Sequence, residues 1–201
     1  MPLSGPCAVE RGPGRTNDQE CHVSSSLSSS SSSFSSTDAD QLVTDRLVLR
    51  SWSTAEADAV LRSGRLPHWA EDFPAEGDRV IVGLFAEHQE WLGAFGHRQV
   101  VERESGLVVG SIGLFWPPAD GEIEIGYGIV ATRRGRGYAS EATRALTEFA
   151  LTAAEVHTVH ASVEPSNPSS VRVLEKAGFQ RVASEEGLHR FRATEADLTQ
   201  R

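Results

Sequence analysis

The sequence predicts a mixed α/β fold, a sheet with helices on both faces, from two adjoining patterns and the order in which such patterns recur. Residues 122–130 alternate apolar residues with glutamate and glycine, which is typical of a strand. Residues 139–153 repeat apolar residues at three- and four-residue steps, which indicates one face of a helix. Strand and helix patterns precede and follow this pair, and their order favours a mixed sheet covered on both sides.

The ordered part of the chain is expected to begin near residue 41 with a strand and a capped helix. Residues 44–50 alternate, so they predict a first strand with Leu47 and Leu49 on one face. Ser53 and Glu56 have the spacing of a capping box, which predicts the start of a helix.

A second helix and a hairpin are predicted next. Asp78 is expected to cap the helix, and the hairpin strands are expected at residues 97–103 and 107–116 with a turn at Gly106. The apolar face of the second helix is predicted to hold Val80, Ile81, Leu84, Phe85 and Trp91.

The last third of the chain predicts a strand, a helix and a final hairpin. Residues 158–163 are expected to form the strand. Asn167 followed by Pro168 is a strong helix start, and Gly178 fits the end of that helix. The hairpin strands are expected at residues 179–183 and 189–193.

Composition restricts the kinds of partner. The chain has 201 residues, 39% of them hydrophobic and 23% charged, which suits one domain with a core and a tail. The net charge of −9 argues against general binding of nucleic acid. No apolar run reaches the length of a membrane span, and the first residues lack a signal core. Both cysteines, Cys7 and Cys21, precede the domain, so the sequence favours a cytoplasmic protein.

Residues 1–40 are predicted to be a disordered tail, and residues 41–201 the folded domain. The tail mixes serine, glycine and proline, with a serine tract between Ser24 and Ser36. Such a segment has too little apolar surface to offset the entropy of ordering.

A loop rich in glycine and arginine, residues 133–137, joins the strand at 122–130 to the helix at 139–153. Glycine lets the backbone approach a ligand, and a helix start supplies unpaired N–H groups and a positive dipole end. Together they favour a phosphate or pyrophosphate site. The loop lacks the ending of a P-loop and the third glycine of the dinucleotide fingerprint. A basic surface turn is the plainer alternative.

Arg134-x-x-Gly137-x-Ala139 resembles the coenzyme A pyrophosphate loop of the GNAT N-acetyltransferase superfamily. The resemblance implies the GNAT fold, a mixed, mostly antiparallel twisted sheet of about six to seven strands flanked by about four helices. Further stretches resemble the branch typified by ribosomal-protein N-terminal acetyltransferases: Thr44–Arg50, Glu124–Tyr127, Arg134–Ala142, Asn167–Ser170 and Leu174–Phe179.

The resemblance implies that acetyl-CoA is the co-substrate and lies where the strand at 122–130 separates from the strand at 158–163. Main-chain groups near Ile129 and Val130 would hold the pantetheine arm, and an N–H near Val130 would polarise the thioester carbonyl. The pyrophosphate would be bound by backbone N–H groups of Arg134, Gly135, Arg136, Gly137, Tyr138 and Ala139.

The resemblance also assigns roles to polar side chains. Glu124 lies on the strand face opposite the apolar row and would act as a general base, directly or through water; an ordinary solvated carboxylate is the alternative. Asn167 would contact the pantetheine or a water besides capping its helix. Ser170 would protonate the departing thiolate, since Leu174 stands where many GNAT enzymes carry a tyrosine.

Other polar and aromatic residues are given lesser roles. Tyr127 is expected in the core and Tyr138 beside the cofactor loop, while Arg133 and Arg136 are expected either to reach the phosphates or to be solvated. The seven histidines indicate no metal site. The resemblance places the acceptor pocket near Trp69, Glu71, Asp72 and Phe73.

The sequence therefore predicts an N-acetyltransferase that moves an acetyl group from acetyl-CoA to a primary amine of a small molecule or a protein N-terminus. Direct attack in a ternary complex is expected, because the domain has no cysteine nucleophile. A non-catalytic acyl-CoA sensor and a phosphate-loop protein outside this family are the alternatives. No nucleic acid, membrane or metal is expected as a partner, and a homodimer is compatible with the resemblance.

Overall fold

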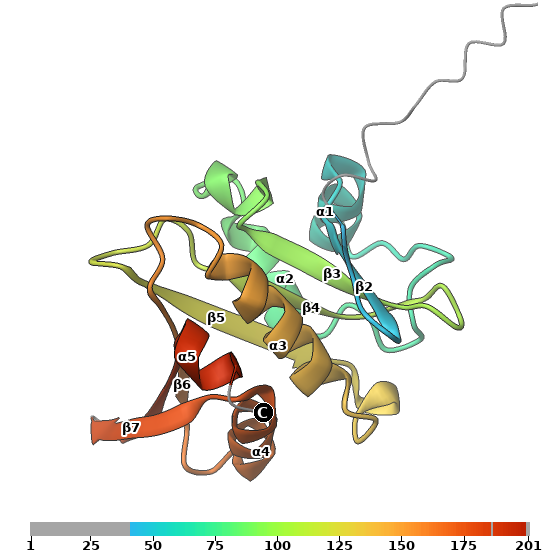
Figure 1. Ribbon diagram of the computed structural model, residues 1–201. Coiled ribbons are helices and arrows are strands. Elements are labelled where there is room, and N and C mark those ends of the chain that lie inside the picture. The colour runs from blue at the N-terminus through green and yellow to red at the C-terminus, as the bar shows by residue number, and fades with distance from the viewer. Residues whose placement is uncertain (1–40, 186, 200–201) are drawn as a thin grey trace, which may run out of the picture. The chain divides into compact units, whose positions relative to one another are not determined.

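The computed structural model describes residues 41–185 and 187–199, which build one eight-stranded sheet (Figure 1). All neighbouring strands are antiparallel except β5 and β6, so the predicted mixed, mostly antiparallel sheet is confirmed. In sheet order the strands are β1 (Leu42–Val43), β2 (Leu47–Ser51), β3 (His97–Glu102), β4 (Val108–Leu114), β5 (Glu122–Ile129), β6 (Thr158–Val163), β8 (Leu188–Ala193) and β7 (Gln180–Glu185).

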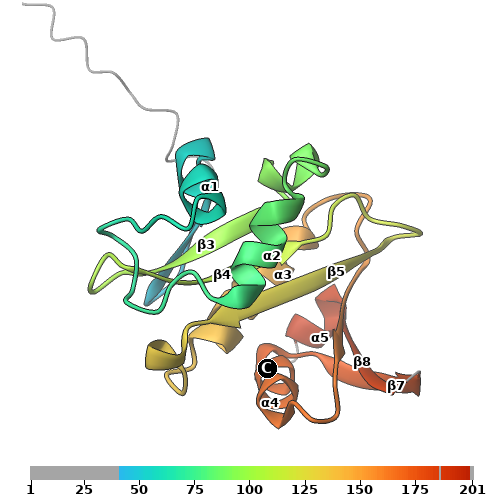
Figure 2. The ribbon, with the colours of Figure 1, turned by 180° about the vertical axis from the view of Figure 1, so that it is seen from behind.

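Helices cover both faces of the sheet, as the sequence predicted. Helix α3 lies over one face, and α1 and α2 lie over the opposite face (Figures 1 and 2). Helix α5 was not predicted, because a helix of five residues carries too little periodicity to detect. The helices are α1 (Thr54–Leu61), α2 (Glu76–Leu84), α3 (Tyr138–Ala150), α4 (Pro168–Ala177) and α5 (Glu195–Thr199), with short 3-10 turns at Gln89–Leu92 and Ala131–Arg133.

The sheet opens between its two parallel strands. The register pairs Glu122–Glu124 of β5 with Thr158–His160 of β6, and in the described part of the chain the rest of β5 has no strand on that side. Figure 2 shows β6 turning away from β5. The backbone groups along the second half of this β5 edge therefore lack the partners that a full ladder would supply.

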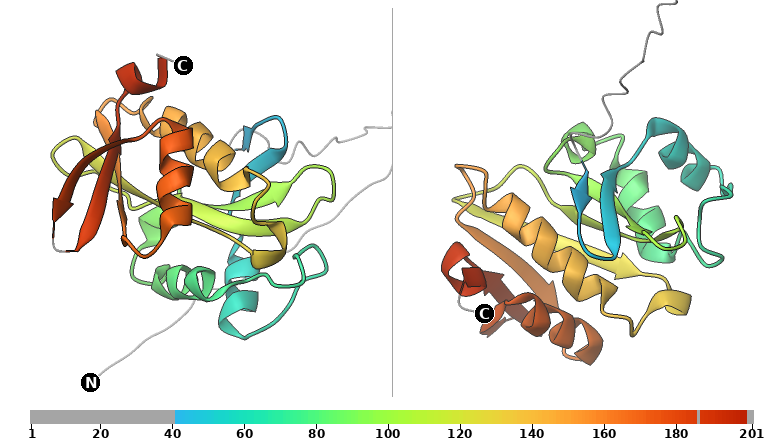
Figure 3. Two further views of the ribbon diagram at one scale, coloured as in Figure 1. Left: turned by 90° about the horizontal axis from the view of Figure 1, so that it is seen from below. Right: turned by 45° about the vertical axis from the view of Figure 1, so that its right-hand side comes forward.

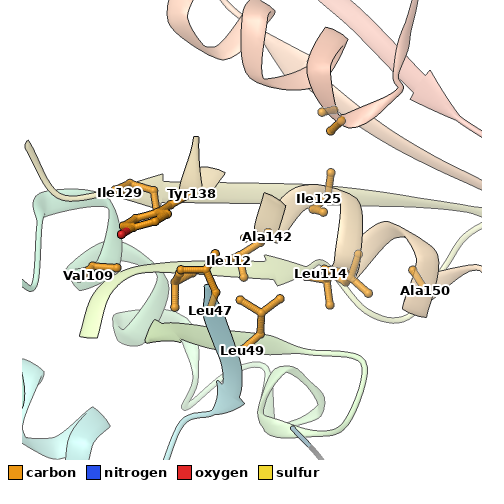
Figure 4. Packing of buried hydrophobic residues seen from close by; sticks show 14 of the residues in the cluster. Leu47, Leu49, Val109, Ile112, Leu114, Ile125, Ile129, Tyr138, Ala142 and Ala150 are labelled. Carbon is orange, nitrogen blue, oxygen red and sulfur yellow. The ribbon is translucent and has the colours of Figure 1, made fainter. Parts of the chain in front are cut away.

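The core beneath α3 follows the strand alternation predicted from the sequence. Leu47 and Leu49 of β2 are both fully buried, with Ile112 and Leu114 of β4 on the same face. Figure 4 shows these side chains gathered with Ile125 of β5 and with the small residues of α3. Alanine at the inner positions of α3 lets the helix approach the sheet closely.

The first predicted strand is shorter than expected. Residues 44–46 form a turn between β1 and β2, in which the Thr44 N–H donates to the carbonyl of Leu47 at 2.9 Å. The alternation of leucine and valine predicted the buried face correctly. It did not predict the turn, because the three polar residues Thr44, Asp45 and Arg46 were included in the strand.

The inner face of α2 differs from the prediction. Ala75, not Asp78, is the N-cap residue, and the Asp78 carboxylate accepts a hydrogen bond from the Ala75 N–H at 2.7 Å. Asp78 and Val82 point inward, whereas Val80 is 58% exposed. Because Asp78 was predicted to be a polar cap residue, it was left out of the buried face of α2, and the exposed Val80 was included instead.

The remaining caps agree with the prediction. Ser53 and Glu56 form the capping box of α1. The Asn167 side chain accepts from the Ser170 N–H, and Gly178 ends α4 in a left-handed conformation. The predicted tail, residues 1–40, lies outside the described residues, and its disorder stays a prediction; the described residues all belong to one unit, Ser35–Arg201.

Candidate active site

A cavity of about 450 Å³ lies between the end of β5, the glycine–arginine loop, the start of α3 and one side of α4. Of the residues predicted for a site, those that line it are Ile129, Arg134, Gly135, Gly137, Tyr138, Ala139, Asn167 and Ser170. Glu124, Val130 and Arg136 lie outside its lining. Residues from three separate stretches of the sequence thus meet at the place where the sheet opens.

The loop has the conformation of an anion-binding turn. Gly135 and Gly137 adopt φ angles of +78° and +84°, which residues with a side chain rarely adopt. A Cβ added to Gly135 would meet nothing within 4 Å, so space remains above this part of the backbone.

The N–H groups of this turn are unpaired over a continuous run. The Arg134 N–H donates to the carbonyl of Ala131 at 3.3 Å, but from Gly135 to Ser140 none donates to another described residue. They include the free donors of the first turn of α3, where the helix dipole is positive. An anion of the size of a diphosphate fits this run of donors.

Glu102 of β3 contacts the glycine–arginine loop through a hydrogen bond and two ion pairs. This carboxylate is only 4% exposed and accepts a hydrogen bond from the Tyr138 hydroxyl at 2.7 Å. Arg133 and Arg136 form ion pairs with it at 3.5 and 3.4 Å. Burial opposes its charge, but hydrogen bonds from Ser105 and Tyr138 and these two arginines lower the pKa of Glu102 below its usual value.

A second carboxylate ties the same loop to the start of β2. Glu141 accepts from the Thr44 hydroxyl at 2.6 Å and forms an ion pair with Arg46 at 2.6 Å. Arg46 also donates to the carbonyl of Arg136 at 2.8 Å, and its guanidinium lies 5.1 Å from the centre of the Tyr138 ring. The loop is therefore fastened to two strands before any ligand binds.

The open edge of β5 carries the backbone groups of its odd-numbered residues. Phe115 donates to the carbonyl of Glu124 and Val130 donates to Val109, so even-numbered positions point toward β4. In an antiparallel ladder the alternate residues face the other way, here toward the opening.

This alternation revises what was expected of Val130. Its N–H is used by Val109, and its carbonyl accepts from Arg133 at 3.0 Å. The carbonyl of Ile129 faces the opening and accepts from Arg134 Nε at 2.9 Å. The free N–H nearest to the cavity on this edge is therefore expected on Ile129 or Tyr127, and Val130 serves to anchor the end of the strand.

Glu124 lies on the sheet face away from α3, as predicted. Its neighbours Ile123 and Ile125 are 1% and 3% exposed beneath α3, whereas Glu124 is half-buried on the other face. Farther along this face are Gly126 and Gly128, and a Cβ added to Gly128 would meet nothing within 4 Å. A Cβ added to Gly126 would meet the Phe115 ring at 3.1 Å, so Phe115 covers this face next to Glu124, and the face is open at Gly128.

A histidine that sequence reasoning left unassigned lies beside Glu124. His160 of β6 is its register partner, and the Nδ1 atom of His160 is buried without a hydrogen-bond partner among the described residues. Burial lowers the pKa of His160, and the charges of Glu124 and Glu122 oppose this shift while that of Arg190 adds to it. Only strand pairing could reveal this neighbour, because the two residues are far apart in the sequence.

Ser170 and Tyr127 meet at the start of α4. Ser170 is half-buried and its side-chain hydroxyl has no hydrogen bond to a described residue, while its carbonyl accepts from the Tyr127 hydroxyl at 3.2 Å. Burial raises the pKa of Tyr127 to about 12, so the phenol stays protonated at neutral pH.

The expectation for Tyr127 was therefore only half right. Its ring packs against the core, but the residue also lines the cavity and reaches α4. Alternation along the strand gave the face of the ring correctly. The distance from β5 to α4 depends on tertiary packing, which the sequence did not show.

The residues expected at the acceptor pocket divide into two groups. Trp69 and Phe73 are both 2% exposed and pack edge to face at 5.3 Å, so they belong to the core. Asp72 instead accepts from the N–H and hydroxyl of Thr132 at 2.9 and 2.7 Å, which ties its loop to the end of β5. Of these residues, Glu71 is exposed.

Two features are absent from the described residues. Among them, no group of three or more histidine, cysteine, aspartate or glutamate side chains is arranged to hold a metal ion. None of the helices they form is both long and apolar enough to cross a membrane.

Comparison with known proteins places this arrangement in a family. Residues 46–180 match the family model described as the acetyltransferase (GNAT) domain. The chain is 31% identical over 83 residues to the uncharacterized N-acetyltransferase p20 of Bacillus licheniformis, covering 41% of this chain and 47% of that protein. It is 30% identical over 116 residues to the probable N-acetyltransferase YjcK of Bacillus subtilis, covering 56% and 63%. The chain thus spans about half the length of the curated relatives that it matches.

Solved structures share the fold at lower identity. A protein from Vibrio cholerae named as a ribosomal-protein-serine acetyltransferase has a TM-score of 0.56 and 23% identity, covering 77% of this chain and 97% of its own. Spermidine N-acetyltransferase from Vibrio cholerae, solved with CoA and spermine, has a TM-score of 0.56 and 16% identity, covering 78% and 99%. With the family match over most of the described sheet, these findings support one conclusion: the chain belongs to the GNAT acetyltransferase family.

Proposed function

We propose that this protein is an N-acetyltransferase that moves an acetyl group from acetyl-CoA to a primary amine by direct attack in a ternary complex. The observation that carries the proposal is the run of unpaired N–H groups from Gly135 to Ser140 beside a cavity at the opening of the sheet. Phosphate binding by such a run is general. Its position in a GNAT domain supports the proposal that it binds the diphosphate of coenzyme A.

The residues present fit coenzyme A. The turn leaves space above the backbone at Gly135 that a side chain would fill. The outward N–H and carbonyl groups of the β5 edge suit the amides of a pantetheine arm, which needs both donors and acceptors. Asn167 lines the same cavity, but its Oδ1 already accepts from the Ser170 N–H at 3.1 Å, so only its amide NH₂ is left to donate.

Glu124 is proposed as the group that removes a proton from the acceptor ammonium. Only a neutral amine carries the lone pair needed for attack on a carbonyl, and a half-buried carboxylate on this strand can take the proton directly or through water. His160 beside it is held neutral by burial at neutral pH and gives Glu124 a polar neighbour without a competing positive charge.

Ser170 is proposed as the donor of the proton that the leaving thiolate requires. Its hydroxyl lies at the cavity without a partner among the described residues, whereas the Tyr127 hydroxyl is already committed to the Ser170 carbonyl. Acetyl-CoA would supply the thioester and leave as the thiol of coenzyme A, and the chain would supply orientation, the base and this proton donor.

For the acetyl donor we propose one molecule, acetyl-CoA, whereas for the acceptor we propose only a class of primary amines. The two structural neighbours act, by name, on spermidine and on a ribosomal protein, so a small polyamine-like amine and a protein N-terminus both stay open. We also propose a cytoplasmic protein that needs neither nucleic acid nor membrane, with a homodimer as one assembly to test. A non-catalytic acyl-CoA sensor is the alternative.

The test of cofactor binding uses two matched glycines. Gly135 and Gly106 have φ angles of +78° and +70°, and a Cβ at either position would meet nothing within 4 Å. Gly135→Glu and Gly106→Glu therefore carry a similar backbone cost, but only the first places a carboxylate in the cavity. At about a hundred times its dissociation constant, acetyl-CoA should stabilise wild type and Gly106→Glu by roughly 2.7 kcal/mol.

The measurement is thermal unfolding with and without acetyl-CoA. Gly135→Glu should show almost no shift, because its charge repels the diphosphate. A shift of equal size in both variants, or none in wild type, would refute the assignment of the loop.

A further inference from the structure

The cavity contains a second group of positive charges, apart from the loop. Its charged lining residues are Arg133, Arg134, Arg172 and Lys176, and among the described residues no carboxylate lines it. The first two belong to the loop, and the other two belong to α4. Since the whole chain has a net charge of −9, such an excess of cations around one cavity calls for an anionic ligand.

The loop arginines are already occupied. Arg133 pairs with Glu102 at 3.5 Å, and Arg134 Nε donates to the carbonyl of Ile129 at 2.9 Å. These contacts shape the loop, whose main-chain N–H groups then face the ligand. The side chains of Arg133 and Arg134 thus mainly hold the loop in its conformation.

Arg172 differs from them. It is exposed on α4, it lines the cavity, and it forms no hydrogen bond or ion pair with any other described residue. Lys176 follows one helical turn later, so both side chains lie on the same side of the helix, together with Ser169 and Val173 of the lining. Figure 3 shows α4 running alongside α3, whose first turn carries the unpaired N–H groups.

The two anion-binding surfaces are chemically different. The loop offers neutral donors that wrap around a ligand, and α4 offers full positive charges on long side chains. A ligand with a single diphosphate would need only the first. A ligand with a diphosphate and a separate phosphomonoester would use both.

We propose that Arg172, together with Lys176, binds the ribose 3′-phosphate of coenzyme A and thereby selects the 3′-phosphorylated cofactor over its dephospho form. This inference rests on the proposed function and adds specificity-determining residues to the same site. The 3′-phosphate is nearly dianionic at neutral pH, so an arginine can meet it with two N–H groups.

The test compares the dissociation constants of CoA and 3′-dephospho-CoA by isothermal titration calorimetry. Wild type should bind CoA about tenfold more tightly, the gain expected from one charge-assisted pair that is partly exposed. In Arg172→Gln the ratio of the two constants should fall below about threefold, with the affinity for dephospho-CoA unchanged. Lys176→Gln should lower the ratio in the same sense.

Arg192→Gln is the matched control, since Arg192 is an exposed arginine on β8 outside the cavity lining. It should keep the wild-type ratio, and melting temperatures should show that all variants are folded. A ratio near one in wild type would overturn the inference. So would a Arg172→Gln variant that keeps the full ratio or weakens both ligands equally.

The design separates this inference from the proposed function. If wild type binds both ligands equally well, the cofactor site stands and only the role of Arg172 fails. If wild type binds neither ligand, the proposed function itself fails, and the inference fails with it.

Discussion

Ser170 takes part in a helix cap and also lines the cavity. Its N–H satisfies the Asn167 side chain at the start of α4, while its hydroxyl lies at the cavity. Leu174, which is fully buried, removes any phenol from the next turn of the helix. The only phenol near this helix start in the described residues is Tyr127, which arrives from β5.

We expect Ser170→Ala to lower kcat for acetyl transfer about tenfold or more, because the donor for the thiolate is lost. Tyr127→Phe should change kcat less than threefold and lower the free energy of unfolding by about 1 kcal/mol, the usual value of one hydrogen bond. Steady-state kinetics and urea unfolding measure the two effects. A larger loss of kcat in Tyr127→Phe than in Ser170→Ala would move the donor role to the phenol.

Glu124 has a matched control on its own strand. Glu122 lies two residues earlier on the same face, is exposed, and pairs with Arg190 at 2.8 Å. Glu124→Gln should lower kcat about 100-fold, the range of a lost general base, while leaving the affinity for acetyl-CoA unchanged.

Glu122→Gln should keep kcat within about twofold of wild type, since its carboxylate is already paired at the surface. The readouts are kcat by an assay of released thiol and the acetyl-CoA dissociation constant by calorimetry. Equal kcat values for the two variants would remove Glu124 from the mechanism. No transfer to any amine in wild type, with intact acetyl-CoA binding, would favour the sensor.

At the scale of elements, β3 contributes to both faces of the sheet. Its end carries Glu102 to the glycine–arginine loop on the α3 side, and Arg98, which is fully buried, lies on that side as well. The Arg98 guanidinium donates to the carbonyls of Leu49 and Ala94 and lies 5.2 Å from the centre of the Phe149 ring. A fully buried arginine in a strand is tolerated only with such partners, and two of them, Leu49 and Phe149, are far from it in sequence.

The opposite face of β3 holds a histidine in an aromatic cage. His97 is 2% exposed and lies 5.1 Å from the centre of the Trp91 ring and 5.2 Å from that of Phe115. Burial lowers the pKa of His97 to about 4 from an ordinary 6.5. In the unfolded chain His97 therefore binds a proton below pH 6.5, whereas in the folded chain it binds one only below about pH 4.

The contribution of neutral His97 to the free energy of unfolding is fully present above pH 6.5 and is lost as the pH falls toward 4. We expect the free energy of unfolding to drop by about 2 kcal/mol between pH 7 and 5, and by clearly less in His97→Gln. Urea unfolding at both pH values measures the difference. His157→Gln, at an exposed histidine, should keep the wild-type drop, and a His97→Gln variant with the same drop would refute the argument.

At the scale of the whole molecule, the candidate site lies where strands β5 and β6 stop pairing. Strands β5 and β6 pair over three residues and then separate, which exposes one edge of β5 to the cavity. The loop beyond that edge is held by Glu102 and by Glu141 with Arg46, residues from three distant stretches. A predicted tail before residue 41 and a folded domain after it stay our proposal for the organisation of the chain.

The sequence by itself determined the local features. Periodicity placed nearly every strand and helix, and cap residues fixed the starts of α1 and α4. The spacing of Arg134, Gly137 and Ala139 carried the resemblance to a coenzyme A loop. These signals are readable because each depends on residues a few positions apart.

Only the tertiary structure decided which residues meet. It placed His160 beside Glu124 and paired Arg133 and Arg136 with Glu102. It brought the Tyr127 hydroxyl to α4 and gave the N–H and carbonyl of Val130 hydrogen-bond partners. It also placed Arg172 in the lining of the cavity. Each of these contacts joins elements far apart in the chain, and strand register and helix packing fix them. No pattern confined to one stretch of sequence contains that information.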